Sequence, residues 1–259
     1  MKVGYIYRMF DIRTLALPIR VTENKYVKST LEDSVHFGSL EGYKNIESQG
    51  IGDEDEGKIV GLLKKGESKI TIRSPESDKE ITLTDKDFMQ DPQMEYRLKD
   101  GVEKRIGVAS FGLLTFRDFK LDRSFNNRKY FKLRKDTLDD IKRLIEDKEK
   151  LTGNKCNLII FSNPDFFSSI KESGYEADIV QYYDPYNLSQ FLKLKNGNKA
   201  YCYLKKDYFK YQREYRIIKI TKNKFPQEGE NVKIKGISKR ASTFSLDQLK
   251  TLQLIADFN

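Results

Sequence analysis

A chain of 259 residues can bury a sizeable core, and we expect one elaborate domain instead of two small ones. Its 38% hydrophobic and 34% charged residues, with 16 Phe and 15 Tyr, exclude a disordered polar chain, and two cysteines exclude a disulfide scaffold. A formal charge of +9 favours polyanions and makes nucleic acid a candidate partner, although a lysine-rich composition of genomic origin explains the charge as well.

Membrane spans are not predicted, because no run approaches the ~18 apolar residues that a spanning helix needs. The first residues, Met1 to Tyr5, enter a strand pattern without the apolar stretch of a signal peptide. The sequence therefore predicts a cytoplasmic protein with no membrane partner.

The N-terminal part predicts strands over 2–8 and 34–40, joined by a loop-rich segment around Pro18. Ser39 is a suitable N-cap for a short helix that ends near Glu47. An acidic loop follows, with four consecutive carboxylates from Asp53 to Glu56.

The middle of the chain predicts a meander of short strands over 58–83, a polar insertion or lid at about 85–104, and an apolar central strand over 105–116. The clearest helix begins at Asp136 and ends at Gly153. Its apolar stripe consists of Leu138, Ile141, Leu144, Ile145 and Leu151.

The C-terminal part begins with a buried strand over 157–162, because Leu-Ile-Ile-Phe is apolar throughout. Further expected elements are a helix from Pro164 to Glu172, a strand over 179–183, a short helix over 187–194, a strand that contains Gln212 to Ile218, and a closing helix over 245–254. The expected fold class is α+β, with a mainly antiparallel split or two-sheet β-core and peripheral helices.

The Gln212-Arg213-Glu214 triplet is the strongest chemical signal. On a strand, residues two apart project from one face. A carboxylate with an amide beside it suits the stabilisation of a positively charged sugar carbon while a neighbour positions the attacking group. The alternative is an exposed strand carboxylate that pairs with Arg213, Arg216 or a cross-strand lysine and contributes little. Arg216 either neutralises Glu214 or binds a pyrophosphate through its planar fork.

The single histidine, His36, ends a predicted strand beside Gly38 and the hydroxyl of Ser39. This position suits the ribose and amide of a nicotinamide nucleotide. The alternative is a satisfied, partly buried ring with no ligand.

The order of these segments resembles the ADP-ribosyltransferase superfamily. The first motif of that superfamily corresponds to His36 or to Arg8, the second to Ser110 in Ala109 to Gly112, and the third to Gln212-Arg213-Glu214. The chain departs from the usual first motif in that Phe37 separates the histidine from the glycine. The resemblance implies NAD as cofactor, Glu214 as the catalytic carboxylate and Gln212 as the group that orients the acceptor.

The chain also resembles a group of bacterial and phage proteins with the pattern F-x-S-L-x-x-Y-x-x-x-E, here Phe37 to Glu47, which includes Ser39 and Tyr43. Later parts of that pattern are Asp53 to Gly57, Ser110-Phe111 and Glu214 to Ile217. This resemblance implies a toxin or defence effector in phage-host conflict, with a neutralising protein partner. Ser39, Tyr43, Ser110 and Arg216 complete the expected cofactor-binding set.

Two other classes of function remain open. Asp53, Asp55 and Glu214 could hold the Mg²⁺ of a nuclease. Tyrosines near the C-terminus, among them Tyr208 and Tyr211, could stack on single-stranded bases in a non-catalytic binder. No P-loop and no G-x-G-x-x-G motif occurs, which argues against a kinase and a Rossmann dehydrogenase. The prediction is an ADP-ribosyltransferase-like enzyme that uses NAD to modify a macromolecular acceptor such as nucleic acid.

Overall fold

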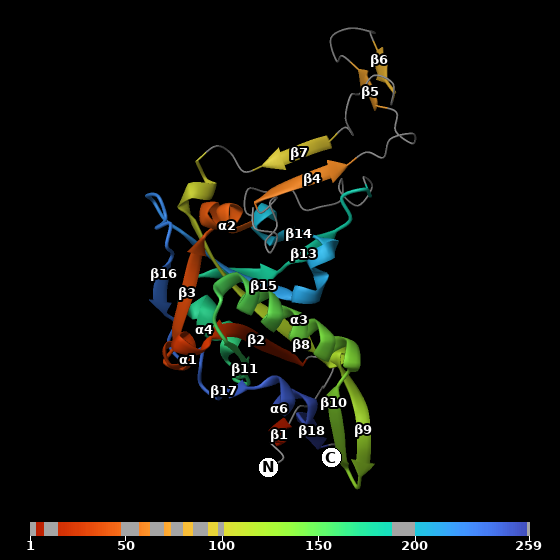
Figure 1. Cartoon of the computed structure of the whole chain (residues 1–259), viewed down its shortest axis with the longest axis vertical. Helices are drawn as coiled ribbons and strands as arrows, with labels where there is room; N and C mark the ends of the chain where they lie inside the picture. The colour runs from red at the N-terminus through yellow and green to blue at the C-terminus, as the bar shows by residue number, and fades with distance from the viewer. Residues whose placement is uncertain are drawn as a thin grey trace.

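The structure is a computed structural model that describes residues 4–7, 15–47, 57–62, 70–73, 80–84, 93–97, 101–187 and 200–257. It is mixed α+β, with mostly antiparallel sheets and few helices, which confirms that part of the expected fold class (Figure 1). Arg8, the acidic loop and most of the expected helix over 187–194 lie outside the described residues.

The largest sheet has eight strands and is antiparallel throughout. Its main path runs in the order β12 (Glu176–Ile179), β15 (Glu214–Ile220), β8 (Ile106–Thr115), β2 (Ala16–Glu23), β11 (Cys156–Phe161) and β17 (Ala241–Phe244). Beside this path, β3 (Ser34–Ser39) pairs with β8, and β16 (Glu230–Lys233) pairs with β3.

Two strands, β3 and β2, pair with different parts of the same edge of β8. Along one edge it pairs with β15 from Ile106 to Gly112. Along the other edge it pairs with β3 at Gly107 and Val108, and with β2 only from Gly112 onward. The sheet therefore divides beside residues 109–111, where β2 and β3 diverge.

Smaller sheets surround the large one. One has the order β1 (Gly4–Tyr7), β18 (Gln253–Asp257), β10 (Arg128–Leu133) and β9 (Phe119–Phe125), in which β1 runs parallel to β18. The two-stranded sheets are β13 (Gln181–Tyr183) with β14 (Leu204–Lys206), β4 (Lys58–Leu62) with β7 (Gln93–Arg97), and β5 (Ile70–Arg73) with β6 (Glu80–Leu83).

The short strands expected over 58–83 are confirmed as β4, β5 and β6, but their arrangement as a meander is wrong. β4 pairs with β7, and the hairpin of β5 and β6 lies between them in sequence. This hairpin extends away from the rest of the molecule (Figure 1). The segment expected as an insertion or lid contributes β7 to that pairing.

The helices surround the sheets. They are α1 (Asn24–Leu31), α2 (Leu40–Glu47), α3 (Lys135–Thr152), α4 (Phe166–Glu172) and α6 (Leu246–Lys250), with short 3₁₀ turns η3 (Glu103–Arg105), η4 (Phe116–Asp118), η5 (Ala200–Tyr203) and η6 (Asp207–Gln212). The long helix α3 was predicted almost to the residue, and Gly153 ends it in the left-handed conformation with φ 68°. No helix in the described part of the chain combines the length and apolar character needed to cross a membrane.

The large sheet is buried on both faces. Leu158 and Ile160 of β11 belong to one apolar cluster with α3, α6 and the four-stranded sheet. Ile159 and Phe161 of the same strand belong to a second cluster that includes Phe166 of α4. Successive side chains of a strand alternate between faces, so a strand buried on both faces shows the continuous apolar run seen in the sequence.

Two expectations at the ends of the chain are wrong. The segment around Pro18 is not a loop but β2, followed by α1. Proline fits there because pairing with β11 begins only at Ile19, so Pro18 has a strand partner on one edge alone. The closing helix also stops at Lys250, and β18 replaces its second half.

Candidate functional site

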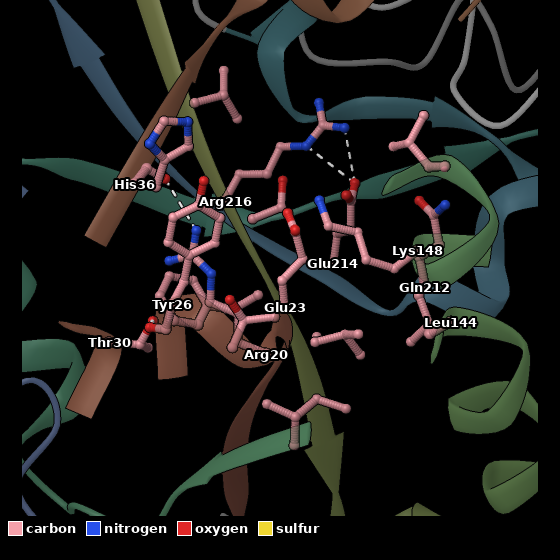
Figure 2. Close-up of a pocket in the computed structure, with 18 of the residues that line it drawn as sticks. Arg20, Glu23, Tyr26, Thr30, His36, Leu144, Lys148, Gln212, Glu214 and Arg216 are labelled. Atoms are coloured by element: carbon pink, nitrogen blue, oxygen red, sulfur yellow. Dashed lines mark hydrogen bonds and ion pairs between the residues drawn. The ribbon is translucent and has the colours of Figure 1, made fainter. Parts of the chain in front are cut away.

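A cavity of about 530 Å³ lies where the large sheet divides (Figure 2). Its volume falls within the range of roughly 300 to 1,000 Å³ that is typical of small-molecule sites. Its wall includes side chains from β2, α1, β3, β8, α3, β14, η6 and β15.

The carboxylate of Glu214 lies in this cavity, at the first residue of β15, and the residue is only 9% exposed. Its Oε2 accepts hydrogen bonds from Arg216 Nη2 at 2.8 Å and Nε at 3.1 Å, and Lys205 Nζ lies 3.6 Å away. Arg216 is itself buried, and its Nη1 donates to the carbonyl of Cys202 at 2.7 Å. The carboxylate is thus held by two buried cations, and Figure 2 shows the hydrogen bonds from one of them, Arg216.

The charge of Glu214 follows from this environment. Burial alone would raise its pKa, but the charges of Arg216 and Lys205, with hydrogen bonds from Arg216 and Ser110, outweigh burial and hold the pKa below its usual value. The group is therefore a fixed anion at neutral pH and not a proton donor.

The position of Gln212 differs from the prediction. Gln212 ends η6, Arg213 takes the left-handed conformation with φ 49°, and β15 begins only at Glu214. The expectation that Gln212 and Glu214 project from one strand face is therefore wrong. Both side chains nevertheless line the cavity, and Lys205 Nζ connects them by donating to Gln212 Oε1 at 2.7 Å.

The left-handed residue Arg213 is held by two carboxylates. Its Nη1 bonds to the buried Asp118, and its Nη2 lies 2.6 Å from Asp140 on α3. These ion pairs attach the turn between Gln212 and Glu214 to η4 and α3. The sequence reading assigned Arg213 only as a pairing partner of Glu214, which it is not.

Three more predicted residues reach the same cavity. Ser110 of β8 lies opposite Arg216 in the strand pairing, and Tyr43 enters from α2. His36 of β3 also lines the cavity, and its Nδ1 lies 3.1 Å from Asn231 Oδ1. Burial lowers the pKa of His36, and the positive charges of Arg20 and Lys148 lower it further, against a hydrogen bond to Asn231 that raises it.

Ser39 lies outside the cavity. It is buried, and its Oγ accepts a hydrogen bond from the backbone N–H of Gly42 at 3.3 Å, near the start of α2. This contact serves the N-terminal end of the helix, as the N-cap assignment expected.

Two cations in the cavity were not anticipated. Arg20 of β2 and Lys148 of α3 both line it. Arg20 was missed because its segment was read as a loop. Lys148 could have been found, because it occupies the helix face of Leu144 and Leu151, four and three residues away, and a lysine within an apolar stripe is unusual.

No protein-family model, no curated protein and no solved structure matches this chain. The interpretation of the cavity therefore depends on its geometry.

Of the three carboxylates that the nuclease hypothesis requires, the structure describes only Glu214. Asp53 and Asp55 lie outside the described residues, so their distance from Glu214 stays a prediction. Within the part of the chain that the structure describes, no three His, Cys, Asp or Glu side chains gather as a metal site would require. The two cations beside Glu214 Oε2 would compete with a metal ion for that oxygen.

Proposed function

We propose that the protein is an ADP-ribosyltransferase-like enzyme that uses NAD to modify a macromolecular acceptor such as nucleic acid. The observation that supports this most is the convergence of Gln212, Glu214, Ser110 and His36 on one cavity, although they come from segments far apart in the sequence. The finer fold assignment, an ADP-ribosyltransferase-like core, is part of the same proposal.

NAD would supply an activated ribose, whose bond to nicotinamide can break in favour of an acceptor. Glu214 offers a fixed negative charge in a buried setting, where electrostatic stabilisation of a developing positive charge is strongest. Arg216 orients the carboxylate and keeps it ionised. The acceptor would be positioned by the amide of Gln212, which Lys205 holds beside the carboxylate.

The test is nicotinamide release and transfer of a labelled ADP-ribosyl group to mixed nucleic acid and protein acceptors. We expect Glu214→Gln to lower nicotinamide release roughly 100-fold, because one preorganised charge is lost at the reacting centre. Glu172→Gln removes an exposed carboxylate on α4 and should leave the rate unchanged.

Gln212→Ala gives a second readout, because it leaves the ion pairs of Glu214 in place. It should reduce transfer to the acceptor more than hydrolysis of NAD. Wild-type protein that releases no nicotinamide with any acceptor, or a folded Glu214→Gln variant as active as wild type, would show that the proposed reaction is wrong.

A further inference from the structure

Some of the charged side chains that line the cavity have a partner of opposite charge or a hydrogen-bond donor, and others have no ion pair in the part of the chain that the structure describes. Glu214 pairs with Arg216, Glu23 lies 3.0 Å from Lys25, and Asp147 accepts a hydrogen bond from Tyr211 at 2.7 Å. These three lining carboxylates thus each have a partner, and the fourth, Glu228, is exposed. Two lining cations, in contrast, have no ion pair among the described residues.

Arg20 is the first of these cations. Its Nη2 donates to the carbonyl of His36 at 3.0 Å, and its Nη1 is buried without a hydrogen-bond partner. Burial lowers its pKa, and among the described residues Tyr43 opposes this without reversing it. The guanidinium lies 5.0 Å from the centre of the Phe111 ring, which fixes its position without neutralising it.

Lys148 is the second. Burial lowers its pKa and the positive charge of Arg20 lowers it further, while Cys156 and the negative charge of Glu23 oppose this without reversing it. Neither cation has an ion pair within 4 Å among the residues that the structure describes. His36 is subject to both charges as well, so three basic groups influence one another at this end of the cavity.

We propose that Arg20 and Lys148 form a binding site for the diphosphate of a nucleotide. Arg20 and Lys148 are half-buried in the cavity wall. A partly desolvated charge without a counter-ion is costly, and an anionic ligand in the cavity would offset that cost. A guanidinium fork with an ammonium group suits phosphate oxygens, to which each donates charge-assisted hydrogen bonds. The cavity is much larger than one phosphate, so the anion belongs to a larger molecule.

This site does not depend on the proposed transfer reaction, because it follows from the uncompensated charges alone. Neither cation belongs to the residues that the family resemblance indicates. The ligand therefore can be tested by equilibrium binding, without any turnover.

The experiment is calorimetric titration of the full chain with inorganic pyrophosphate, ADP-ribose and adenosine. We expect pyrophosphate and ADP-ribose to bind and adenosine to bind much more weakly. Lys148→Gln and Arg20→Gln should each weaken pyrophosphate binding about tenfold or more, which is the loss of one charge-assisted contact. Lys150→Gln is the matched control, since it removes an exposed charge of the same helix.

Stability provides a check on folding. Arg20→Gln removes a cation that has no ion pair among the described residues, together with one hydrogen bond to the carbonyl of His36. Without ligand, the melting temperature of this variant should therefore lie close to that of wild type. Arg20→Lys keeps the charge and should retain part of the affinity.

Three outcomes would overturn the site: wild-type protein that binds no pyrophosphate, equal weakening by Lys148→Gln and Lys150→Gln, or adenosine binding as tightly as ADP-ribose. Pyrophosphate binding should persist in Glu214→Gln. Wild-type protein that binds pyrophosphate but releases no nicotinamide with any acceptor would contradict the transferase and leave the diphosphate site intact.

Discussion

At the scale of single residues, the pair of Glu214 and Arg216 combines structural and chemical roles. Arg216 is 2% exposed and donates hydrogen bonds to the carboxylate of Glu214 and to the carbonyl of Cys202. A buried pair of this kind adds little net stability relative to apolar residues, but loss of one member leaves an uncompensated charge. The cavity thus depends on both members being present.

We expect Arg216→Gln to lower the free energy of unfolding by roughly 3 kcal/mol, because Glu214 then keeps only Lys205 as a cationic partner. The double variant with Glu214→Gln should be less destabilised than Arg216→Gln alone, since the unpaired charge is gone. Chemical denaturation measures both. Equal stability of the single variant and wild type would contradict the ion-pair interpretation.

The pH dependence follows from the same pair. The pKa of Glu214 in the folded protein lies below its ordinary value of 4.5, so its contribution to stability is complete above that pH and is lost as pH falls through the folded pKa. This acid loss should be smaller in Arg216→Gln, where the pKa is less depressed.

At the scale of elements, β8 determines the geometry of the site. Gly112 lies opposite Glu214 in the strand pairing. A Cβ at Gly112 would lie 2.8 Å from Ile19 Cγ1 and 3.3 Å from the carbonyl of Gln212, so it would press on β2 and on the turn before Glu214 together.

We therefore expect Gly112→Ala to lower the free energy of unfolding by about 1 to 3 kcal/mol and to weaken pyrophosphate binding. Gly107→Ala is the comparison on the same strand, because the atoms nearest to its Cβ would belong to the ring of Phe225 and not to the cavity wall. That variant should lose stability and keep its affinity for pyrophosphate. If both folded variants lost the same affinity for pyrophosphate, the idea that Gly112 in particular shapes the cavity would be wrong.

Helices and strands with a strong local sequence pattern were predicted better than those whose position depends on distant residues. The helix α3 and the strand β11 were predicted well, because an apolar stripe with a terminal glycine and a continuous apolar run are local signals. β2 was missed, since Pro18 and Arg20 are atypical of a central strand and their tolerance depends on where β8 and β11 begin to pair. The turn at Arg213 was missed because its two carboxylate partners are distant in sequence.

The candidate site was predictable only in part. Residue types and their order indicated Glu214, Gln212, Ser110, His36 and Tyr43, all of which reach the cavity. The distances among them, and the contribution of Lys148 from a helix face, are tertiary facts that one sequence does not contain.

In the molecule as a whole, the net charge of +9 lies outside the cavity, because the wall of the cavity carries four Lys or Arg and four Asp or Glu residues. Beside the cavity, Tyr208 is 67% exposed, and the Arg143 guanidinium lies 5.1 Å from its ring centre and 3.8 Å from that of Tyr211. An exposed aromatic ring next to a cation is suited to stacking on a nucleobase.

If nucleic acid is the acceptor, single-stranded oligonucleotides should bind, and the logarithm of the binding constant should fall linearly with the logarithm of salt concentration as counterions are released. Tyr208→Ala should weaken this binding by about 1 to 3 kcal/mol. Fluorescence anisotropy with a labelled oligonucleotide measures both effects. Binding that is absent at low salt would remove nucleic acid as the acceptor and leave a protein in that role.

The divided edge of β8 has a consequence for how the chain tolerates change. Because a strand alternates its side chains, sliding β8 by one residue along β15 would replace Ser110 with Ala109 or Phe111 opposite Arg216 and reverse which side chains meet the ligand space. Insertions or deletions inside this strand should therefore be far more damaging than equal changes in the hairpin of β5 and β6, which pairs with no other strand in the described part of the chain.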